Sequence, residues 1–210
     1  LYNLTVFALV AQGITFSGDE PNYLLTTDSL LDDHDINLAN NYAEQDYFHF
    51  ISKKDNPNLR LGIYGRYGKK GHDYVYPINL PGISVLTLPF YALGRLAGGR
   101  LLTFLIKGSL AVWGALFGVQ IYLFALDRWR KEWLALSLWT LVSFTAPVLF
   151  YSTHLYPEIA IAFLALLVYR KATGDAPLRT VHYLGLGFLA STFFWFGVKY
   201  NLIFWPLLAV

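Results

Sequence analysis

Three acidic side chains stand where an apolar segment meets a polar one. Asp19 and Glu20 follow the first apolar run of the chain, and Glu158 follows Pro157 at the start of a later one. A carboxylate within hydrogen-bond reach of a hydroxyl can take its proton as the oxygen attacks another centre. Acids in a first helical turn also interact favourably with the helix dipole, so capping is the competing explanation. We expect Asp19, Glu20 and Glu158 to be catalytic if these helix starts converge on one pocket.

Lys199 is the candidate for binding an anion. It lies within residues 193–205, which are otherwise almost wholly apolar. A lysine in such a run usually pairs with an acid or an anionic ligand, although its ammonium group can instead snorkel to the membrane surface. For Lys107, near the outer end of its own apolar run, snorkelling is the expected explanation.

Residues 32–37, with the sequence DDHDIN, offer several oxygen ligands and resemble the first half of a calcium loop. Counted from Asp33, however, Leu38 occupies the sixth position, where an EF-hand needs glycine. An EF-hand is therefore excluded. A looser site for a divalent cation remains an alternative, without assigned metal ligands. The histidines show no spacing typical of metal ligands, and we expect them to be solvated.

The elements that must position these residues follow from the apolar composition. The chain has 210 residues, of which 55% are hydrophobic and only 14% are charged, whereas soluble domains carry about 25% charged residues. Residues 101–126 contain Lys107 as their only charge and exceed the ~20 residues that cross a bilayer as a helix. We predict an all-α integral membrane protein, a polytopic bundle with about five transmembrane helices. The predicted spans are residues 1–16, 101–126, 133–151, 156–169 and 181–210.

The basic residues predict how this bundle is oriented. Loops 127–132 and 170–180 each carry three Lys or Arg residues, whereas 152–155 carries none. Short loops rich in Lys and Arg stay in the cytoplasm. Residues 17–98 then form a long outer loop between the first span (1–16) and the remaining spans (99–210). Within this loop we expect two helices at the membrane surface, over residues 22–31 and 80–96, and an exposed flexible stretch over 53–72.

Charge and cysteine content exclude several classes of protein. A formal net charge of +2 is too small to argue for a nucleic-acid partner. The sequence contains no cysteine, which excludes disulfides and thiolate metal sites. Because the chain lacks Met and ends within an apolar run, we expect it to be the N-terminal part of a longer protein.

Several short motifs together resemble the first outer loop of bacterial membrane glycosyltransferases of the GT-C superfamily. They are SGDEPNYLL at 17–25, DSLL at 28–31, DINLANNY at 35–42, PG at 81–82, PFY at 89–91 and HLYPE at 154–158. The resemblance is to the protein O-mannosyltransferase and aminoarabinose transferase-like enzymes, family 39 in glycosyltransferase classification. Relatives often carry histidine before the Pro-Gly pair, where this chain has Asn79.

The resemblance implies transfer of a sugar from a polyprenyl-phosphate donor to a lipid, glycan or protein acceptor. It implies that Asp19 is the base, Glu20 its helper and Glu158 a second acid, and that Lys199 helps to hold the lipid phosphate. From the matching motifs we expect His154, Tyr156, Asn41 and Tyr42 to contribute to substrate binding. The expected location is the bacterial inner membrane, with several membrane passes and the active site on the outer face.

Two other functions agree with the same residues. A polytopic transporter could place Lys199 and Glu158 along a substrate path, but it predicts internal repeats, which the sequence does not show. A non-catalytic subunit of a larger membrane complex predicts that Asp19 and Glu158 cap their own helices, with no cavity between them.

Overall fold

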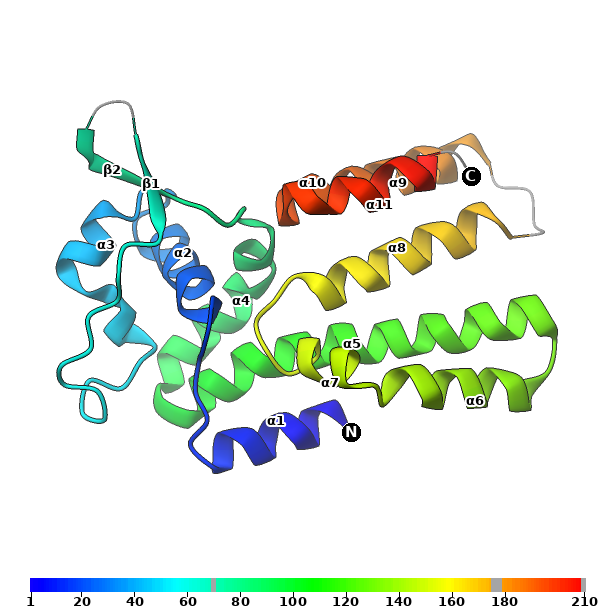
Figure 1. Cartoon of the computed structure of the whole chain (residues 1–210), viewed down its shortest axis with the longest axis horizontal. Helices are drawn as coiled ribbons and strands as arrows, with labels where there is room; N and C mark the ends of the chain where they lie inside the picture. Colours follow the sequence, from blue (N-terminus) through cyan, green and yellow to red (C-terminus); the bar gives the residue numbers. More distant parts are fainter. Residues whose placement is uncertain (69–70, 175–178, 209–210) are drawn as a thin grey trace. The chain divides into compact units, whose positions relative to one another are not determined.

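The structure is a computed structural model that describes residues 1–68, 71–174 and 179–208. It is mostly helical, with 70% of the chain in helices. The chain divides into two compact units (Figure 1). The first contains most of residues 1–109 together with 154–156, and the second contains 110–153 and 157–210.

The first unit combines short helices with one β-hairpin. Its elements are α1 (Tyr2–Ala11), α2 (Glu20–Asp32), α3 (Ala39–Glu44), the 3-10 helix η1 (Asp46–His49), β1 (Gly65–Gly68), β2 (Gly71–Pro77), α4 (Gly82–Ala97) and the first third of α5 (Gly99–Trp129). Helices α2 and α4 pack together, and the Ser84 hydroxyl donates a hydrogen bond of 2.9 Å to the Tyr23 carbonyl. Leu24, Leu25 and Ile83 are buried between them and neighbouring elements.

Helix α2 begins where the sequence predicts, with Asp19 as N-cap and Pro21 in the first turn. Proline fits there because the first helical N–H groups have no acceptor within the helix. The expectation that this helix lies along a membrane surface is wrong, since residues from Glu20 to Ser29 are almost all buried inside the unit. Helix α4, at Gly82–Ala97, also lies close to the helix predicted over residues 80–96.

The two strands form an antiparallel hairpin that begins within residues 53–72, the stretch expected to be a flexible loop, and extends beyond it to Pro77. Arg66 pairs with Tyr76, and Tyr67 pairs with Val75. The hairpin is held to the start of α3, because the Leu38 N–H donates to the Val75 carbonyl at 2.8 Å. Alternating aromatic and β-branched residues over 74–76 favour a strand.

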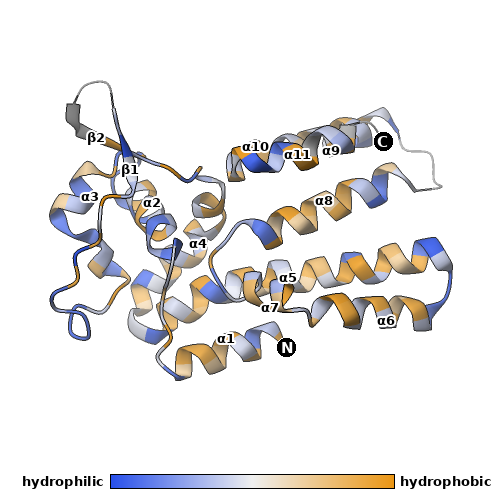
Figure 2. Cartoon of the chain, in the orientation of Figure 1, coloured by the Kyte–Doolittle hydropathy of each residue, from blue (hydrophilic) through white to orange (hydrophobic). Residues whose placement is uncertain are grey.

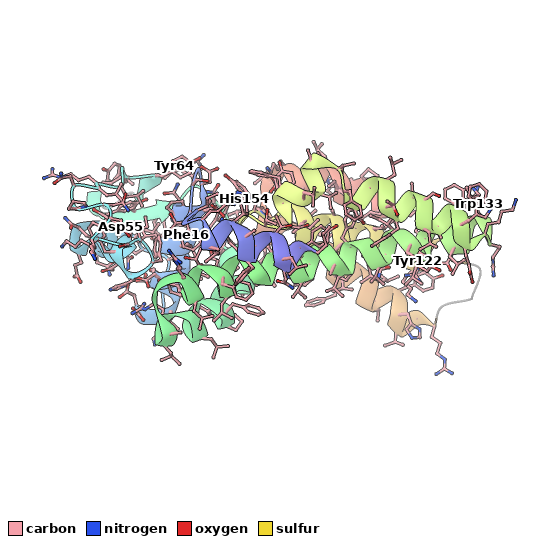
Figure 3. The ribbon with its side chains drawn as sticks, turned by 90° about the horizontal axis from the view of Figure 1, so that it is seen from below. Phe16, Asp55, Tyr64, Tyr122, Trp133 and His154 are labelled. Atoms are coloured by element: carbon pink, nitrogen blue, oxygen red, sulfur yellow. The ribbon has the colours of Figure 1, made fainter. Side chains whose placement is uncertain are left out.

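The second unit consists of helices. They are the remainder of α5, α6 (Glu132–Ser143), α7 (Ala146–Tyr151), α8 (Glu158–Ala172), α9 (Thr180–Ser191), α10 (Phe193–Phe196), the 3-10 helix η2 (Val198–Tyr200) and α11 (Asn201–Leu208). The connection from α5 to α6 lies at one end of the unit, near the labelled Tyr122 and Trp133 (Figure 3). Side chains of α6 approach α5 closely at Gly118. Hydrophobic residues dominate α5, α6 and α8 (Figure 2).

The prediction of a bundle with five transmembrane helices is wrong. Among the described residues, only α5, with 31 residues, is long and apolar enough to cross a membrane. The other predicted spans are shorter or interrupted. Residues 1–16 contain a helix of 10 residues and 156–169 one of 15 residues, about 15 and 22 Å at 1.5 Å per residue, against a hydrocarbon core of ~30 Å.

Local sequence explains the interruptions in the other two segments. In 133–151 the helix stops at Ser143 and restarts at Ala146, with Pro147 in the first turn of α7. Proline disfavours continuation of a helix from the residues before it. In 181–210 the helical path is broken at Thr192 and Gly197. These two long apolar stretches therefore form several short helices instead of one long helix each.

Candidate functional site

Asp19 is a half-buried acid at the first turn of α2. Its side chain makes no capping hydrogen bond, although it occupies the N-cap position. Its backbone N–H donates to the Tyr156 hydroxyl at 3.3 Å. Within the described part of the chain, its carboxylate has no hydrogen-bond or ion-pair partner. Asp19 is therefore available to accept a proton or a hydrogen bond from a ligand.

Glu20, in contrast, is fully buried, and both of its carboxylate oxygens accept hydrogen bonds. Its carboxylate oxygens lie 2.9 and 3.2 Å from the Lys107 ammonium nitrogen, and the Lys107 side chain is also buried. The Ser17 N–H donates to Oε2 at 2.8 Å, and the Leu155 N–H donates to Oε1 at 2.7 Å. Buried charges persist where they are paired and hydrogen-bonded. Glu20 thus joins the turn before α2 to α5 and to the loop before α8.

Tyr156 completes the surroundings of Asp19. Its ring packs edge-on against Tyr23 of α2, with ring centroids 6.2 Å apart. Gly18 has a positive φ of 59°, and a Cβ atom there would lie 2.6 Å from the Tyr156 hydroxyl oxygen. Glycine at position 18 therefore permits both the left-handed turn and the approach of Tyr156 to Asp19.

Glu158 and Lys199 form a second acidic and basic pair, within the second unit. Glu158 is the first residue of α8, and its Oε1 accepts a hydrogen bond of 2.7 Å from Lys199 Nζ in η2. Its Oε2 is buried without a hydrogen-bond partner among the described residues. The Lys199 side chain is 67% exposed, and its ammonium lies 5.0 Å from the Tyr200 ring centroid. The exposed Lys199 ammonium can thus contact a ligand as well as Glu158, whereas the buried Glu158 Oε2 is not open to solvent.

The remaining predicted binding residues lie in the first unit. Asn41 is buried in α3, where its amide donates to Asp33 at 2.8 Å and to Asp46 at 2.9 Å. The Tyr42 hydroxyl accepts the Tyr64 N–H at 3.0 Å, and burial raises the pKa of this phenol. His154 lies in the loop that also carries Tyr156, and its carbonyl accepts the Tyr156 N–H at 2.9 Å. Of these two, Tyr156 contacts Asp19 directly, whereas Asn41 and Tyr42 serve the packing of α3.

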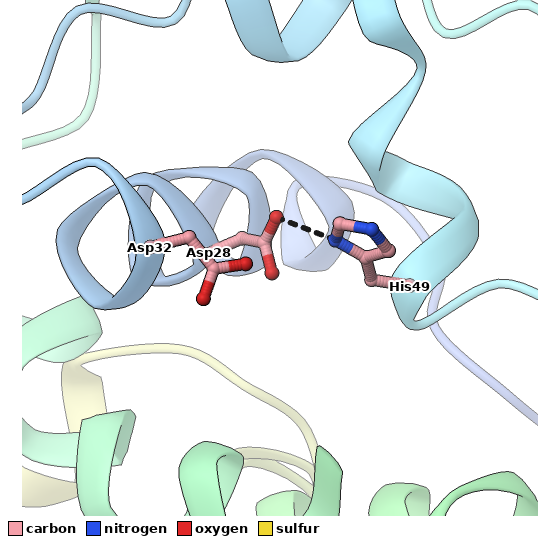
Figure 4. A group of neighbouring side chains, drawn as sticks. All are labelled: Asp28, Asp32 and His49. Atoms are coloured by element: carbon pink, nitrogen blue, oxygen red, sulfur yellow. Dashed lines mark hydrogen bonds and ion pairs between the residues drawn. The ribbon is translucent and has the colours of Figure 1, made fainter.

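A third group of polar side chains centres on Asp28 of α2 (Figure 4). Its Oδ1 accepts hydrogen bonds from the Tyr91 hydroxyl at 2.5 Å and from Arg95 at 2.6 Å, and its Oδ2 lies 2.9 Å from His49 Nδ1. Arg95 also donates to Asp32 at 2.8 Å. Burial, together with the neighbouring Asp28 carboxylate, raises the pKa of Tyr91 well above its ordinary value.

Potential metal ligands within this group are Asp28, Asp32 and His49, whose ligand atoms all lie within 4.8 Å of one another. Of these three residues, only Asp32 belongs to the DDHDIN run at 32–37 that offered oxygen ligands in the sequence. The Arg95 guanidinium already contacts both carboxylates. It therefore supplies much of the positive charge that a bound cation would provide.

Sequence reasoning missed two of these features. Lys107 was expected to snorkel, but it is buried and paired with Glu20. Its position within an apolar run was a signal for such a partner. The histidines were expected to be solvated, and His49 is indeed exposed, but its Nδ1 also contacts Asp28, which the sequence did not predict. Nothing in the spacing of 21 residues between them pointed to that contact.

No protein-family model matches this chain, and no curated protein or solved structure matches it either.

Proposed function

We propose that this protein transfers a sugar from a polyprenyl-phosphate donor to an acceptor hydroxyl, with Asp19 as the general base. The observation that carries the proposal is the contrast between two adjacent acids. The Asp19 carboxylate is half-buried and without a partner among the described residues, whereas Glu20 is fixed by four contacts. A carboxylate left without a partner, beside one held rigidly, is suited to proton transfer.

In this proposal Glu20 positions Asp19 and does not itself take a proton. Both of its oxygens already accept hydrogen bonds, and Lys107 neutralises its charge. Holding the first turn of α2 in place fixes the Asp19 backbone, because the two residues are consecutive. Positioning of a reacting group to within a fraction of an ångström contributes strongly to rate.

Lys199 and Glu158 lie in the second unit, and we propose that they bind a phosphate group there. The exposed Lys199 ammonium supplies the positive charge that a phosphate needs. Glu158 orients this ammonium through the 2.7 Å hydrogen bond, so we propose a positioning role for Glu158 instead of a basic one.

We propose that the protein acts at the outer face of a bacterial cell membrane, with α5 as its membrane anchor. Helix α5 has the length and composition of a membrane span. The acceptor can be a lipid, a glycan or a protein, since each offers a hydroxyl that a carboxylate base can activate. If a divalent cation takes part, we propose that Asp28, Asp32 and His49 are its ligands. The Arg95 guanidinium would then have to move away from the two carboxylates.

Replacement of Asp19 tests the proposed chemistry. Asp19→Asn removes the basic oxygen without changing size, and we expect at least a hundredfold loss of sugar transfer, within the range that general bases contribute. The measurement is transfer of radiolabel from a polyprenyl-phosphate sugar by membranes that contain the protein.

Glu44→Gln is the matched control, because Glu44 is an exposed acid of the same unit that makes no described side-chain contact. This variant should retain full transfer. An Asp19→Asn variant as active as the unchanged protein would exclude Asp19 as the base. Absence of transfer by the unchanged protein with every polyprenyl donor would overturn the proposed function.

A further inference from the structure

A pocket of about 440 Å³ opens in the first unit, where the end of α1, the segment after η1 and the start of α5 meet. Its volume lies within the range of small-molecule sites. The walls are partly apolar, with Val10, Ile14, Phe50 and Leu102 among the lining residues. None of the predicted catalytic residues lines this pocket, so it is separate from the site around Asp19.

Charged and polar side chains also line this pocket. They include Arg100, His49 and Asp55. Arg100 is exposed and has no hydrogen-bond or ion-pair partner among the described residues. A guanidinium without a protein partner, at the edge of a partly apolar cavity, favours an anionic ligand such as a phosphate.

His49 adds a fixed hydrogen-bonding group. Its Nδ1 lies 2.9 Å from the Asp28 carboxylate (Figure 4). Among the described residues Nε2 has no partner. His49 Nε2 and the Asp55 carboxylate can therefore both form hydrogen bonds with hydroxyl groups of a ligand.

The location of the pocket indicates where its ligand comes from. It lies at the first residues of α5, the helix with the length and composition of a membrane span. The first turn of such a helix stands at the level of the lipid headgroups. A ligand that carries a phosphate, hydroxyl groups and a hydrocarbon chain matches the guanidinium, the two hydrogen-bonding groups and the apolar wall together.

We propose that this pocket binds one anionic phospholipid with a hydroxylated headgroup, of the phosphatidylglycerol type. Arg100 contacts the phosphate, His49 and Asp55 form hydrogen bonds with the headgroup hydroxyls, and Val10, Ile14 and Leu102 contact the start of an acyl chain. The lipid does not react there. It anchors the first unit to the bilayer, which goes beyond the proposed sugar transfer.

The test is a titration of the purified full chain, in a non-ionic detergent, with short-chain phosphatidylglycerol, followed by native mass spectrometry. We expect one bound lipid per chain, with about tenfold weaker binding for Arg100→Gln, since it loses a charge-assisted hydrogen bond. Arg128→Gln is the matched control, because Arg128 is an exposed arginine in the last turn of the same helix. Arg100→Lys should restore part of the affinity.

Further ligands distinguish a lipid site from a simple anion site. Phosphatidylcholine of the same chain length should bind much more weakly, and free glycerol phosphate should not compete at equal concentration. Equal binding of phosphatidylcholine, equal competition by glycerol phosphate, or unchanged affinity of Arg100→Gln would each overturn the proposal. Sugar transfer is not measured in this experiment, so its outcome is independent of the role of Asp19.

Discussion

Four hydrogen bonds converge on the Glu20 carboxylate, from Ser17, Leu155 and twice from Lys107. The Lys107 ammonium also lies 5.4 Å from the Phe16 ring centroid, which is a favourable cation–π distance. A buried ion pair gains little over well-packed apolar residues, but removal of one partner leaves an uncompensated charge. The pair therefore matters more for the position of α2 than for net stability.

A double-mutant cycle measures this dependence. We expect Lys107→Met and Glu20→Gln each to lower the free energy of unfolding by about 3–5 kcal/mol, because the remaining charge stays buried. The double variant should lose less than the sum of the two single losses. Chemical denaturation of the purified protein gives all four values. Additive losses would show that the two side chains do not interact in the folded protein.

Tyr91 gives a prediction about alkaline pH. Burial and the Asp28 carboxylate raise the pKa of its phenol, so the folded protein keeps a proton that the unfolded chain loses above a pH of about 10. This contribution to stability is complete below that pH and decreases by up to ~1.4 kcal/mol for each pH unit above it. Tyr91→Phe should show a shallower decrease between pH 10 and 11.

The same substitution has a separate effect at neutral pH. Tyr91→Phe removes a buried hydrogen bond to a carboxylate, and we expect a loss of about 1.5–3 kcal/mol. Tyr74→Phe is the control, because Tyr74 is exposed in the hairpin. Identical alkaline slopes for the unchanged protein and Tyr91→Phe would show that the phenol is not protected from ionisation by the fold.

At the scale of elements, sequence patterns predicted helix positions better than helix lengths. The Asp-Glu-Pro start of α2, the helix over 80–96 and the long apolar helix over 101–126 all agree with the structure. Composition alone could not reveal the breaks near Pro147 and Gly197, because proline and glycine also occur inside continuous helices, such as Pro89 in α4. Local residue propensity determines where a helix can end, and tertiary packing determines whether the helix ends there.

The candidate site shows the same limit of sequence reasoning. The sequence identified the ionisable residues, but their partners came from distant segments. Glu20 meets Lys107 across 87 residues, and Lys199 meets Glu158 across 41. Such contacts follow from the arrangement of elements, which local spacing does not specify. The pairing of Lys199 with an acid agrees with the reasoning from its apolar surroundings.

Helix α5 leads to a prediction about membrane insertion. Val112 lies near its middle and is 47% exposed. If α5 crosses the bilayer, Val112→Lys places a charge in hydrocarbon at a cost of about 2.5–3.5 kcal/mol. We expect a marked drop in the fraction of protein that stays in the membrane pellet after alkaline extraction. Val112→Ala should remain in the pellet, and equal retention of both variants would argue against α5 as a span.

At the scale of the whole molecule, the apolar composition is reflected in many large hydrophobic side chains that the structure leaves exposed. Large hydrophobic side chains of α9 and α11, such as Leu184, Phe188 and Leu202, are exposed within their unit. Contiguous exposed apolar surface usually contacts another protein or a membrane. The low share of charged residues, 14%, is consistent with these exposed apolar side chains. It could not predict how many helices cross a membrane, because exposure to lipid does not require a span.

The buried pair of Glu20 and Lys107 also affects how the chain folds during its synthesis. During synthesis Glu20 emerges 87 residues before Lys107, so α2 must wait for α5 before its buried acid gains a counter-charge. Until they meet, each charge opposes the burial of its own helix, and closing so long a loop is slow compared with forming either helix. Assembly of the first unit and completion of α5 are therefore one cooperative event. Ribosome-bound chains too short for Lys107 to have left the exit tunnel should be degraded by proteases more readily than chains long enough to expose it.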